Sequence, residues 1–274
     1  MNTRFLAIVN PAAGGGRCGK SFPAALETLK SRGLEVDVAM TSKAGEGTEI
    51  ARREWAAGRR HFIAVGGDGT SYEIINGLFP EALATGAADE RPTLGFLPLG
   101  TGNSFLRDFT SEGAAYSLPA ITDGKLQPCD VIRLECAEGT IFYINILSYG
   151  FTADVGALTN RRFKRFGEAG YISAVVVRTA LLKAKPYPMS VDGGPVKSDP
   201  CVFISLNNSQ FTGGKMRMVP HVSVSDGKVA VVEVGKLSRI SLLNTFPKIF
   251  EGKHVSHPKI QTYDAATIDF HLGA

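Results

Sequence analysis

The sequence predicts an α/β domain followed by an all-β domain, and three observations lead to this fold class. Apolar, strand-like runs alternate with helix-like segments in the first part of the chain, as in a parallel sheet covered by helices on both faces. Later in the chain, β-rich runs are separated by turns of Gly, Pro, Asn and Asp. The 274 residues, 44% hydrophobic and 20% charged, suffice for two domains with buried cores. We expect the domains to span residues 1–124 and 125–274.

The first domain is predicted to alternate strands and helices in chain order. Short apolar or alternating runs bounded by Gly, Pro or Asn predict strands over residues 4–9, 34–40, 62–65 and 93–97. Helical spacing of apolar side chains predicts helices over residues 20–31, 47–57 and 71–79. In such sheets ligands bind at the carboxyl ends of the strands, which makes the loops after residues 9 and 65 candidate binding loops.

The second domain is predicted to be mostly antiparallel β-structure. Its expected strands cover residues 131–135, 140–147, 202–206, 222–224, 229–234 and 267–270, and one helical stretch covers 167–183. The most apolar segment, 171–182, is too short to span a membrane and contains Arg178. The net charge of +4 is too small to indicate nucleic-acid binding. The four cysteines lack the paired spacing of a metal site and are expected to be reduced thiols. We therefore expect a cytoplasmic protein that meets a membrane only at its surface.

The most informative stretch is Gly66-Gly67-Asp68-Gly69-Thr70, directly after an apolar strand and before a helix. Glycines allow close approach of a ligand, and the start of a helix offers N–H groups to an anion. A carboxylate beside phosphate groups requires an intervening cation, water or sugar hydroxyl. The stretch is therefore interpreted as a nucleotide triphosphate site with Mg²⁺ at Asp68. The alternative is a tight turn in which Asp68 only caps the helix.

The glycine-rich loop at residues 14–21 matches two other phosphate-binding patterns. Gly14 to Ser21 fits the P-loop pattern, with Lys20 as its lysine, and Gly14, Gly16 and Gly19 fit the dinucleotide pattern. Four residues separate the strand from Gly14, whereas a P-loop turns at once. No acidic residue ends the next strand, as a dinucleotide site requires, because that strand ends in Met40-Thr41. Both matches are therefore expected to be fortuitous.

Three motifs together resemble the diacylglycerol kinase catalytic-domain family, which includes bacterial lipid kinases and the sphingosine and ceramide kinases. These motifs are Asn10-Pro11-x-x-Gly14, Gly66 to Thr70, and Pro98-Leu99-Gly100-Thr101-Gly102-Asn103. Further matches are Gly150-Phe151-Thr152-Ala153, Gly213-Gly214 with Pro220, and Asp226-Gly227-Lys228-Val229. The resemblance implies a three-layer, NAD kinase-like α/β nucleotide-binding domain, a C-terminal β-sandwich domain, and transfer of the ATP γ-phosphate to a lipid hydroxyl.

The resemblance also implies site residues. Contacts with ATP are implied for Asn10, Pro11, Ala12, Ala13, Gly14, Thr41, Gly66, Gly67, Asp68, Gly69, Thr70, Ser71, Tyr72, Glu73 and Thr101. Asp68 is the implied catalytic residue and ligand of Mg²⁺, and Ser223, Asp226 and Lys228 match a structural Mg²⁺ site. A plain turn at Asp226-Gly227 is the alternative.

The chain departs from the family pattern in several places. The family usually has Asn at Tyr72, and Asp at Ser104 and at Thr152. Its usual Asp-Gly-Glu turn, which carries the presumed general base, would follow residue 274, and Asp264 and Asp269 come too early in the chain to replace it. We expect a fragment, with the second domain incomplete at its C-terminal end, or else a protein that lacks the base.

The expected partner is a lipid substrate, diacylglycerol or a sphingoid-type lipid, at a membrane surface. The expected reaction therefore belongs to lipid metabolism, such as phospholipid biosynthesis. The cluster Arg161-Arg162-Phe163-Lys164-Arg165-Phe166 is either an anchor for anionic headgroups or a solvated basic face. A homodimer is an open alternative for the assembly, and no nucleic acid is expected. The alternative functions are a soluble kinase of NAD or a sugar phosphate, and a catalytically weak lipid- or nucleotide-binding module.

Overall fold

The structure is a computed structural model that describes residues 4–84, 90–150 and 183–271. It divides into two compact units, Met1–Tyr143 and Ile144–Ala274. Three features from the sequence lie in residues 151–182, outside the described part. They are Thr152, the basic cluster 161–166 and the predicted helix 167–183 apart from Lys183.

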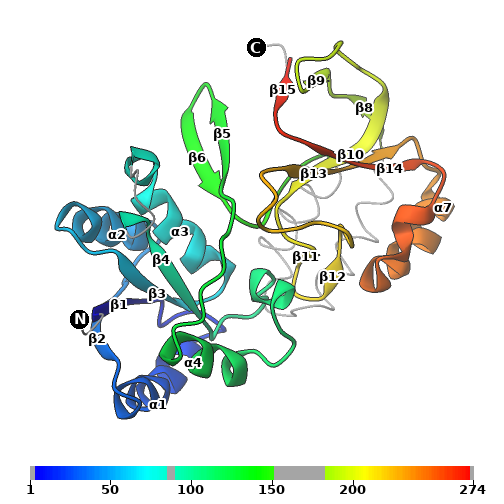
Figure 1. Cartoon of the computed structure of the whole chain (residues 1–274). Helices are drawn as coiled ribbons and strands as arrows, with labels where there is room; N and C mark the ends of the chain where they lie inside the picture. The colour runs from blue at the N-terminus through cyan, green and yellow to red at the C-terminus, as the bar shows by residue number, and fades with distance from the viewer. Residues whose placement is uncertain (1–3, 85–89, 151–182, 272–274) are drawn as a thin grey trace. The chain divides into compact units, whose positions relative to one another are not determined.

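Unit 1 is built on a parallel four-stranded sheet in the order β2-β1-β3-β4 (Figure 1). The strands are β1 (Arg4–Val9), β2 (Glu35–Met40), β3 (His61–Gly66) and β4 (Thr93–Pro98). The helices are α1 (Arg17–Ser31), α2 (Glu46–Ala56), α3 (Asp68–Leu78) and α4 (Ala114–Thr122), with 3₁₀ turns η1 (Glu81–Ala84) and η3 (Phe105–Asp108).

Helices cover both faces of this sheet, and the alternation of apolar residues along β1 explains why. Phe5 and Val9 pack with Leu29 of α1 on one face, where Leu118 of α4 joins the same cluster. The residues between them, such as Ile8, pack on the other face with side chains of α2 and α3. A strand that is apolar on both sides must be covered on both sides. The predicted three-layer α/β architecture is therefore confirmed.

The strand order creates a switch point between β1 and β3. The chain leaves β1 towards β2 on one side, and then crosses to β3 on the other side of β1. Connections on opposite faces leave a crevice at the carboxyl ends of the two central strands, where ligands of doubly wound sheets bind. The loops after β1 and β3 both start at this crevice.

A hairpin of β5 (Ile132–Cys136) and β6 (Gly139–Tyr143) ends unit 1. Asn76 of α3 holds it: its side-chain amide donates to the Phe142 carbonyl (2.8 Å) and accepts the Phe142 N–H (2.9 Å). Phe142 also packs on Phe79, with 5.2 Å between ring centroids. The two units thus divide after Tyr143 rather than after residue 124, because these contacts group the hairpin with the α/β unit.

Unit 2 is an antiparallel β-structure, as predicted. Its main sheet has the order β14-β13-β10-β7, and the short β8 also pairs with β10. These strands are β7 (Ile146–Gly150), β8 (Lys185–Pro186), β10 (Pro200–Asn207), β13 (Val229–Gly235) and β14 (Ile260–Ala265). Smaller pairs are formed by β9 (Met189–Val191) with β15 (Ile268–Phe270), and by β11 (Phe211–Thr212) with β12 (Met216–Arg217).

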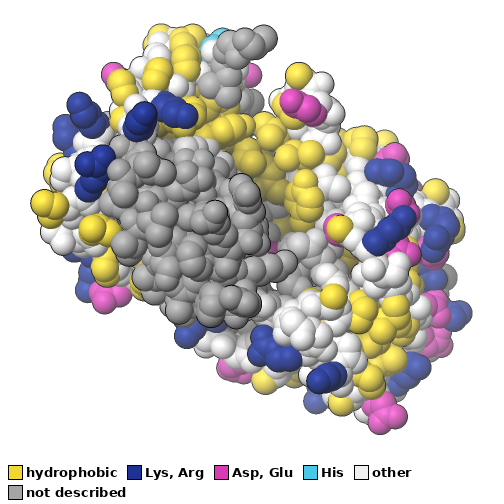
Figure 2. Space-filling view, turned by 180° about the vertical axis from the view of Figure 1, so that it is seen from behind, with side chains coloured by type: hydrophobic (Ala, Val, Ile, Leu, Met, Phe, Trp, Pro, Cys, Tyr) yellow, Lys and Arg dark blue, Asp and Glu magenta, His cyan; other side chains and the backbone are white. Residues whose placement is uncertain are grey.

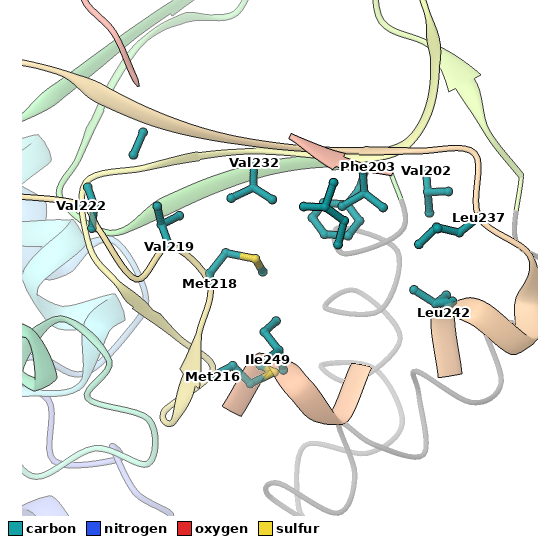
Figure 3. Packing of buried hydrophobic residues seen from close by; sticks show 13 residues of the cluster. Val202, Phe203, Met216, Met218, Val219, Val222, Val232, Leu237, Leu242 and Ile249 are labelled. Atoms are coloured by element: carbon teal, nitrogen blue, oxygen red, sulfur yellow. The ribbon is translucent and has the colours of Figure 1, made fainter. Parts of the chain in front are cut away.

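Side chains are buried on both faces of the main sheet. On one face Phe203 and Val232 point towards Met218 and Ile249 (Figure 3). That cluster is closed by α7 (Arg239–Thr245) and the 3₁₀ turn η6 (Phe246–Glu251), which is followed by the turn η7 (Lys253–Ser256). The other face packs with β9 and β15. The two layers give the sandwich-like arrangement that the sequence predicted.

Several predicted elements differ from the structure. The predicted strand 140–147 is two strands, interrupted where the Asn145 carbonyl accepts the Asn208 N–H. Residues 222–224 form no strand: Val222 and Val224 are buried, but no ladder partner lies beside them among the described residues. The sequence prediction missed α4, α7, β9 and β14. In β14 the polar residues Gln261, Thr262 and Asp264 hid the edge strand.

No helix within the described residues is long and apolar enough to cross a membrane.

Candidate active site

Three loops of unit 1 touch one another at the carboxyl ends of β1, β3 and β4. The Gly100 N–H donates to the Gly66 carbonyl at 2.7 Å, which joins the loops after β3 and β4. A Cβ on Gly100 would lie 2.5 Å from the Gly67 Cα, and one on Gly14 would lie 2.8 Å from the Leu99 carbonyl oxygen. Only glycine permits these backbone approaches. The glycines of all three motifs therefore bring the loops together.

The loop after β1 is shaped by Asn10 and three glycines. The Asn10 N–H donates to Val65 on β3 (2.9 Å), and its side-chain oxygen accepts the Ala12 N–H (3.1 Å). Gly14, Gly15 and Gly16 follow with φ of 63°, 69° and 86°, a left-handed run that side chains disfavour. This run turns the chain directly into α1.

This geometry differs from that of a P-loop. Helix α1 starts at Arg17, so Gly19 and Lys20 are already inside it, and Lys20 is exposed. Gly19 serves helix packing, because an added Cβ would lie 3.2 Å from the Pro11 carbonyl oxygen. In a P-loop, by contrast, the glycine-rich loop runs up to the lysine that reaches the phosphates.

Asp68 connects the loops after β3 and β4. It is the first residue of α3, and its carboxylate accepts the backbone N–H groups of Ser104 (2.9 Å) and Phe105 (3.2 Å). These residues start η3, so Asp68 binds the N-terminus of η3 and does not cap α3. A carboxylate held in place beside glycine loops is the kind of oxygen ligand that a hard cation prefers.

A small pocket opens beside Asp68, with a volume of about 20 Å³, room for one water-sized group. Its lining comes from β3, β4 and the loops that follow them, and includes Gly66, Gly67, Asp68, Ser71, Asn103 and Phe105. Two buried oxygens near it, Thr70 Oγ1 and Asn103 Oδ1, have no hydrogen-bond partner among the described residues. Buried polar atoms are normally paired, so unpaired ones at a loop cluster indicate a place for a polar ligand.

Backbone N–H groups of the glycine loops are also unpaired. Among the described residues those of Gly14, Gly15 and Gly69 donate no hydrogen bond, and Gly69 lies in the first turn of α3. A Cβ added to Gly15, Gly16 or Gly69 would meet nothing within 4 Å, so the space above them is open. N–H donors at a helix N-terminus and in glycine loops form an anion site. This donor set fits the phosphates of a nucleotide.

The remaining predicted contacts of the ATP site have different surroundings. Thr41 directly follows β2 and donates from its N–H (2.8 Å) and hydroxyl (3.3 Å) to the Val9 carbonyl. Tyr72 and Thr101 are exposed beside the loops. The carboxylate of Glu73 accepts the N–H groups of Gly45 (3.0 Å) and Gly47 (2.9 Å), at the start of α2. Glu73 therefore supports a neighbouring helix.

Asn103 is a site residue for which the sequence gave no role. It has φ of 50°, and its side-chain amide donates to the carbonyls of Pro98 and Gly100, both at 3.1 Å. These bonds fold the loop after β4 against Gly67. Its position after two glycines is the available signal, because Asn tolerates the left-handed conformation.

The second predicted metal site lies in unit 2. Asp226 Oδ1 accepts the Lys228 N–H (3.0 Å) and Gly227 has φ of 71°, which is a tight turn before β13. Ser223 and Lys228 are exposed. The described residues contain no group of three His, Cys, Asp or Glu side chains that could hold a metal ion. A cation at this turn would depend on Asp226 and on backbone oxygens, and the site stays a prediction.

Family models match both parts of the chain. Residues 4–134 match the diacylglycerol kinase catalytic domain, and residues 145–273 match the YegS C-terminal NAD kinase beta sandwich-like domain. The chain belongs to the diacylglycerol kinase catalytic-domain family. The resemblance of the three motifs is therefore confirmed.

Relatives are similar along nearly the whole chain. A diacylglycerol kinase of Mycobacterium tuberculosis is 26% identical over 268 residues, which are 97% of this chain and 84% of the relative. One of Staphylococcus aureus is 27% identical over 263 residues, 95% of this chain and 79% of the relative. A crystal structure of a putative diacylglycerol kinase from Bacillus anthracis has a TM-score of 0.75 at 23% identity and covers 98% of this chain. This last likeness supports the fold.

Proposed function

We propose that this chain is an ATP- and Mg²⁺-dependent lipid kinase that transfers the γ-phosphoryl group to a hydroxyl of diacylglycerol or a similar lipid. The observation that carries the proposal is the meeting of three glycine-lined loops around Asp68, in a member of the diacylglycerol kinase catalytic-domain family. Phosphoryl transfer requires mainly positioning and stabilisation of charge on the phosphate oxygens. Backbone donors next to a fixed carboxylate meet both requirements.

ATP is proposed to bind across the loops after β1 and β3. The N–H groups of Gly14, Gly15 and Gly69 are the donors for its phosphates, because they have no other partner among the described residues. The rest of the two loops, Thr41 and Thr101 are retained as the other proposed contacts with ATP. Glu73 is proposed to act indirectly, since its carboxylate is already held by two N–H groups of α2.

Asp68 is proposed to hold Mg²⁺, directly or through water. Its carboxylate is fixed by two backbone donors and lines the pocket at the loop cluster. Oxygen ligands of this kind suit a hard cation. When bound, the cation would supply positive charge to the phosphate oxygens. Ser223, Asp226 and Lys228 are retained as a proposed structural cation site.

The acceptor is proposed to be a lipid, presented at the cytoplasmic surface of a membrane. The relatives with sequences 26–27% identical to this chain are named diacylglycerol kinases, which supports a lipid hydroxyl over a soluble acceptor. A soluble kinase of NAD or of a sugar phosphate is the alternative from the sequence.

An acceptor panel tests the proposal directly. The protein is incubated with γ-labelled ATP and Mg²⁺ and with diacylglycerol, sphingosine, ceramide, NAD, a sugar phosphate or buffer alone. Label in the organic phase with diacylglycerol is the expected result. Label only on NAD or the sugar phosphate would contradict the lipid assignment, and label on no acceptor would leave a binding module.

A further inference from the structure

Residues 236–259 of unit 2 combine two features that the proposed catalysis does not use. Lys236, Arg239, Lys248, Lys253 and Lys259 oppose the single acidic residue Glu251, which gives this segment a net charge of +4. The whole chain also has a net charge of +4. All other residues together therefore have a formal net charge of zero.

The same segment exposes apolar side chains. Ile240 is 74% exposed and Leu243 is 41% exposed, one turn apart on α7. The neighbouring Leu242 is buried in the core cluster of the sheet, so α7 is anchored on one side and apolar on the other as well. Single exposed apolar residues are common, but two on one helix turn within a basic segment form a surface with a definite chemistry.

Three cations of the same segment are available for an external partner. Lys236, Arg239 and Lys248 are exposed and form no ion pair within the described residues, whereas Lys253 is paired with Glu251. Figure 2 shows Lys and Arg side chains next to hydrophobic ones on one face of the molecule, and Figure 1 shows α7 close to the turns η6 and η7. Serine caps the helix, since Ser238 Oγ accepts the Ser241 N–H (3.1 Å), so the apolar pair is presented on a fixed turn.

We propose that the surface formed by Lys236, Arg239, Ile240, Leu243 and Lys248 docks the protein on an anionic lipid bilayer. Apolar side chains flanked by cations are what such an interface binds, since the first enter the headgroup region and the second attract anionic lipids. An acidic protein partner would match the charge, but the exposed aliphatic pair without aromatic anchors favours lipid. The inference rests on the proposed function, because a lipid substrate requires that the enzyme reach a membrane.

Vesicle sedimentation tests docking separately from catalysis. The protein is mixed, without ATP, with vesicles of phosphatidylcholine alone or of phosphatidylcholine with phosphatidylglycerol, over a series of salt concentrations. Preferential binding to the anionic vesicles that weakens with salt is expected. Equal binding to both kinds of vesicle, or none, would overturn the proposal.

Two variants remove the two features in turn. The triple variant Lys236→Gln, Arg239→Gln, Lys248→Gln is expected to weaken binding to anionic vesicles roughly 100-fold, since each cation contributes about fivefold at such a surface. The double variant Ile240→Ser, Leu243→Ser is expected to weaken it about tenfold. All five side chains are exposed, so thermal unfolding should change little.

Matched control variants change the same chemistry elsewhere. Lys30→Gln, Arg32→Gln, Arg91→Gln removes three exposed charges from unit 1, and Leu126→Ser, Val196→Ser removes side chains that are 75% and 54% exposed. If the controls weaken binding as much as the α7 variants, the docking surface is refuted. The same holds if wild-type protein captures RNA or an acidic protein but no vesicles.

The readouts also distinguish failure of the proposed function. Binding that depends on α7, in a protein that phosphorylates no lipid, would support docking and reject the kinase proposal. Lipid phosphorylation in detergent micelles with no α7-dependent binding to vesicles would support the kinase proposal and reject the docking surface.

Discussion

Asp68 is the residue on which the proposed chemistry depends most. Its carboxylate holds the start of η3 through two backbone N–H groups and at the same time lines the pocket at the loop cluster. It therefore has a structural and a proposed catalytic role, and a substitution has to separate the two.

Asp68→Asn is expected to lower kcat at least 100-fold, because the neutral amide cannot hold Mg²⁺ or its waters next to the phosphates. Steady-state assays with labelled ATP measure the effect. The control is Glu27→Gln, which neutralises an exposed carboxylate on α1 and is expected to leave kcat unchanged.

The contrasting variant is Lys20→Ala. Lys20 is exposed inside α1, so its loss is expected to weaken activity only a few-fold. A severe loss with Lys20→Ala and a small one with Asp68→Asn would favour a P-loop mechanism instead.

Glu73 provides a second test at the residue scale. Glu73→Gln is expected to lower the free energy of unfolding by about 1 kcal/mol, because the carboxylate accepts two N–H groups at the N-terminus of α2. Thermal unfolding measures this, with Glu49→Gln on the exposed face of α2 as the control. Unchanged thermal stability with a raised KM for ATP would indicate a direct nucleotide contact.

At the scale of elements, the site depends on how closely the loops after β3 and β4 approach. Gly100→Ala places a Cβ 2.5 Å from the Gly67 Cα, so the two backbones have to move apart. A destabilisation of about 1–3 kcal/mol and a raised KM for ATP are expected. Denaturant unfolding and ATP titration measure the two effects.

Gly69→Ala is the matched variant for this prediction. Its Cβ would meet nothing within 4 Å in the protein, so its stability should not fall. If phosphates occupy the space above Gly69, the added methyl group should nevertheless weaken ATP binding. A silent Gly69→Ala in both assays would contradict the placement of the nucleotide.

The two units have separate cores, and unit 2 contains a buried histidine that predicts the pH dependence of stability. His254 is 4% exposed, and burial lowers its pKa from 6.5 to about 4, with the Met218 backbone opposing this shift. Between pH 6.5 and about pH 4, His254 is protonated in the unfolded chain but still neutral in the folded unit. The free energy of unfolding is therefore highest above pH 6.5 and decreases as the pH falls to 4.

Denaturant unfolding of the whole protein between pH 7 and 4 measures this effect. The loss from His254 is expected to reach about 3 kcal/mol at most. His254→Gln should flatten the dependence in this window, even if it lowers stability overall. An unchanged pH profile in the variant would show that other groups, such as His61, whose pKa burial also lowers, dominate.

Local sequence was sufficient for the strands and helices that surround the proposed nucleotide site. In β1 and β3 every residue after the first is buried, so continuous apolar runs identified these strands, and the glycines after them identified the loops. The same local signal failed at Val222 and Val224, which are apolar because they are buried and not because they pair. It also failed at the polar edge strand β14.

The sequence by itself determined the family, the order of an α/β unit followed by a β unit, and Asp68 as the residue to test. These follow from short motifs and periodicity, which are local properties. Only the tertiary structure decided what Asp68, Glu73 and Asn103 bond to, because their partners lie 36, 28 and 5 residues away and are backbone groups. Backbone N–H and carbonyl groups are common to almost all residues, so no sequence pattern predicts which of them will be the partner.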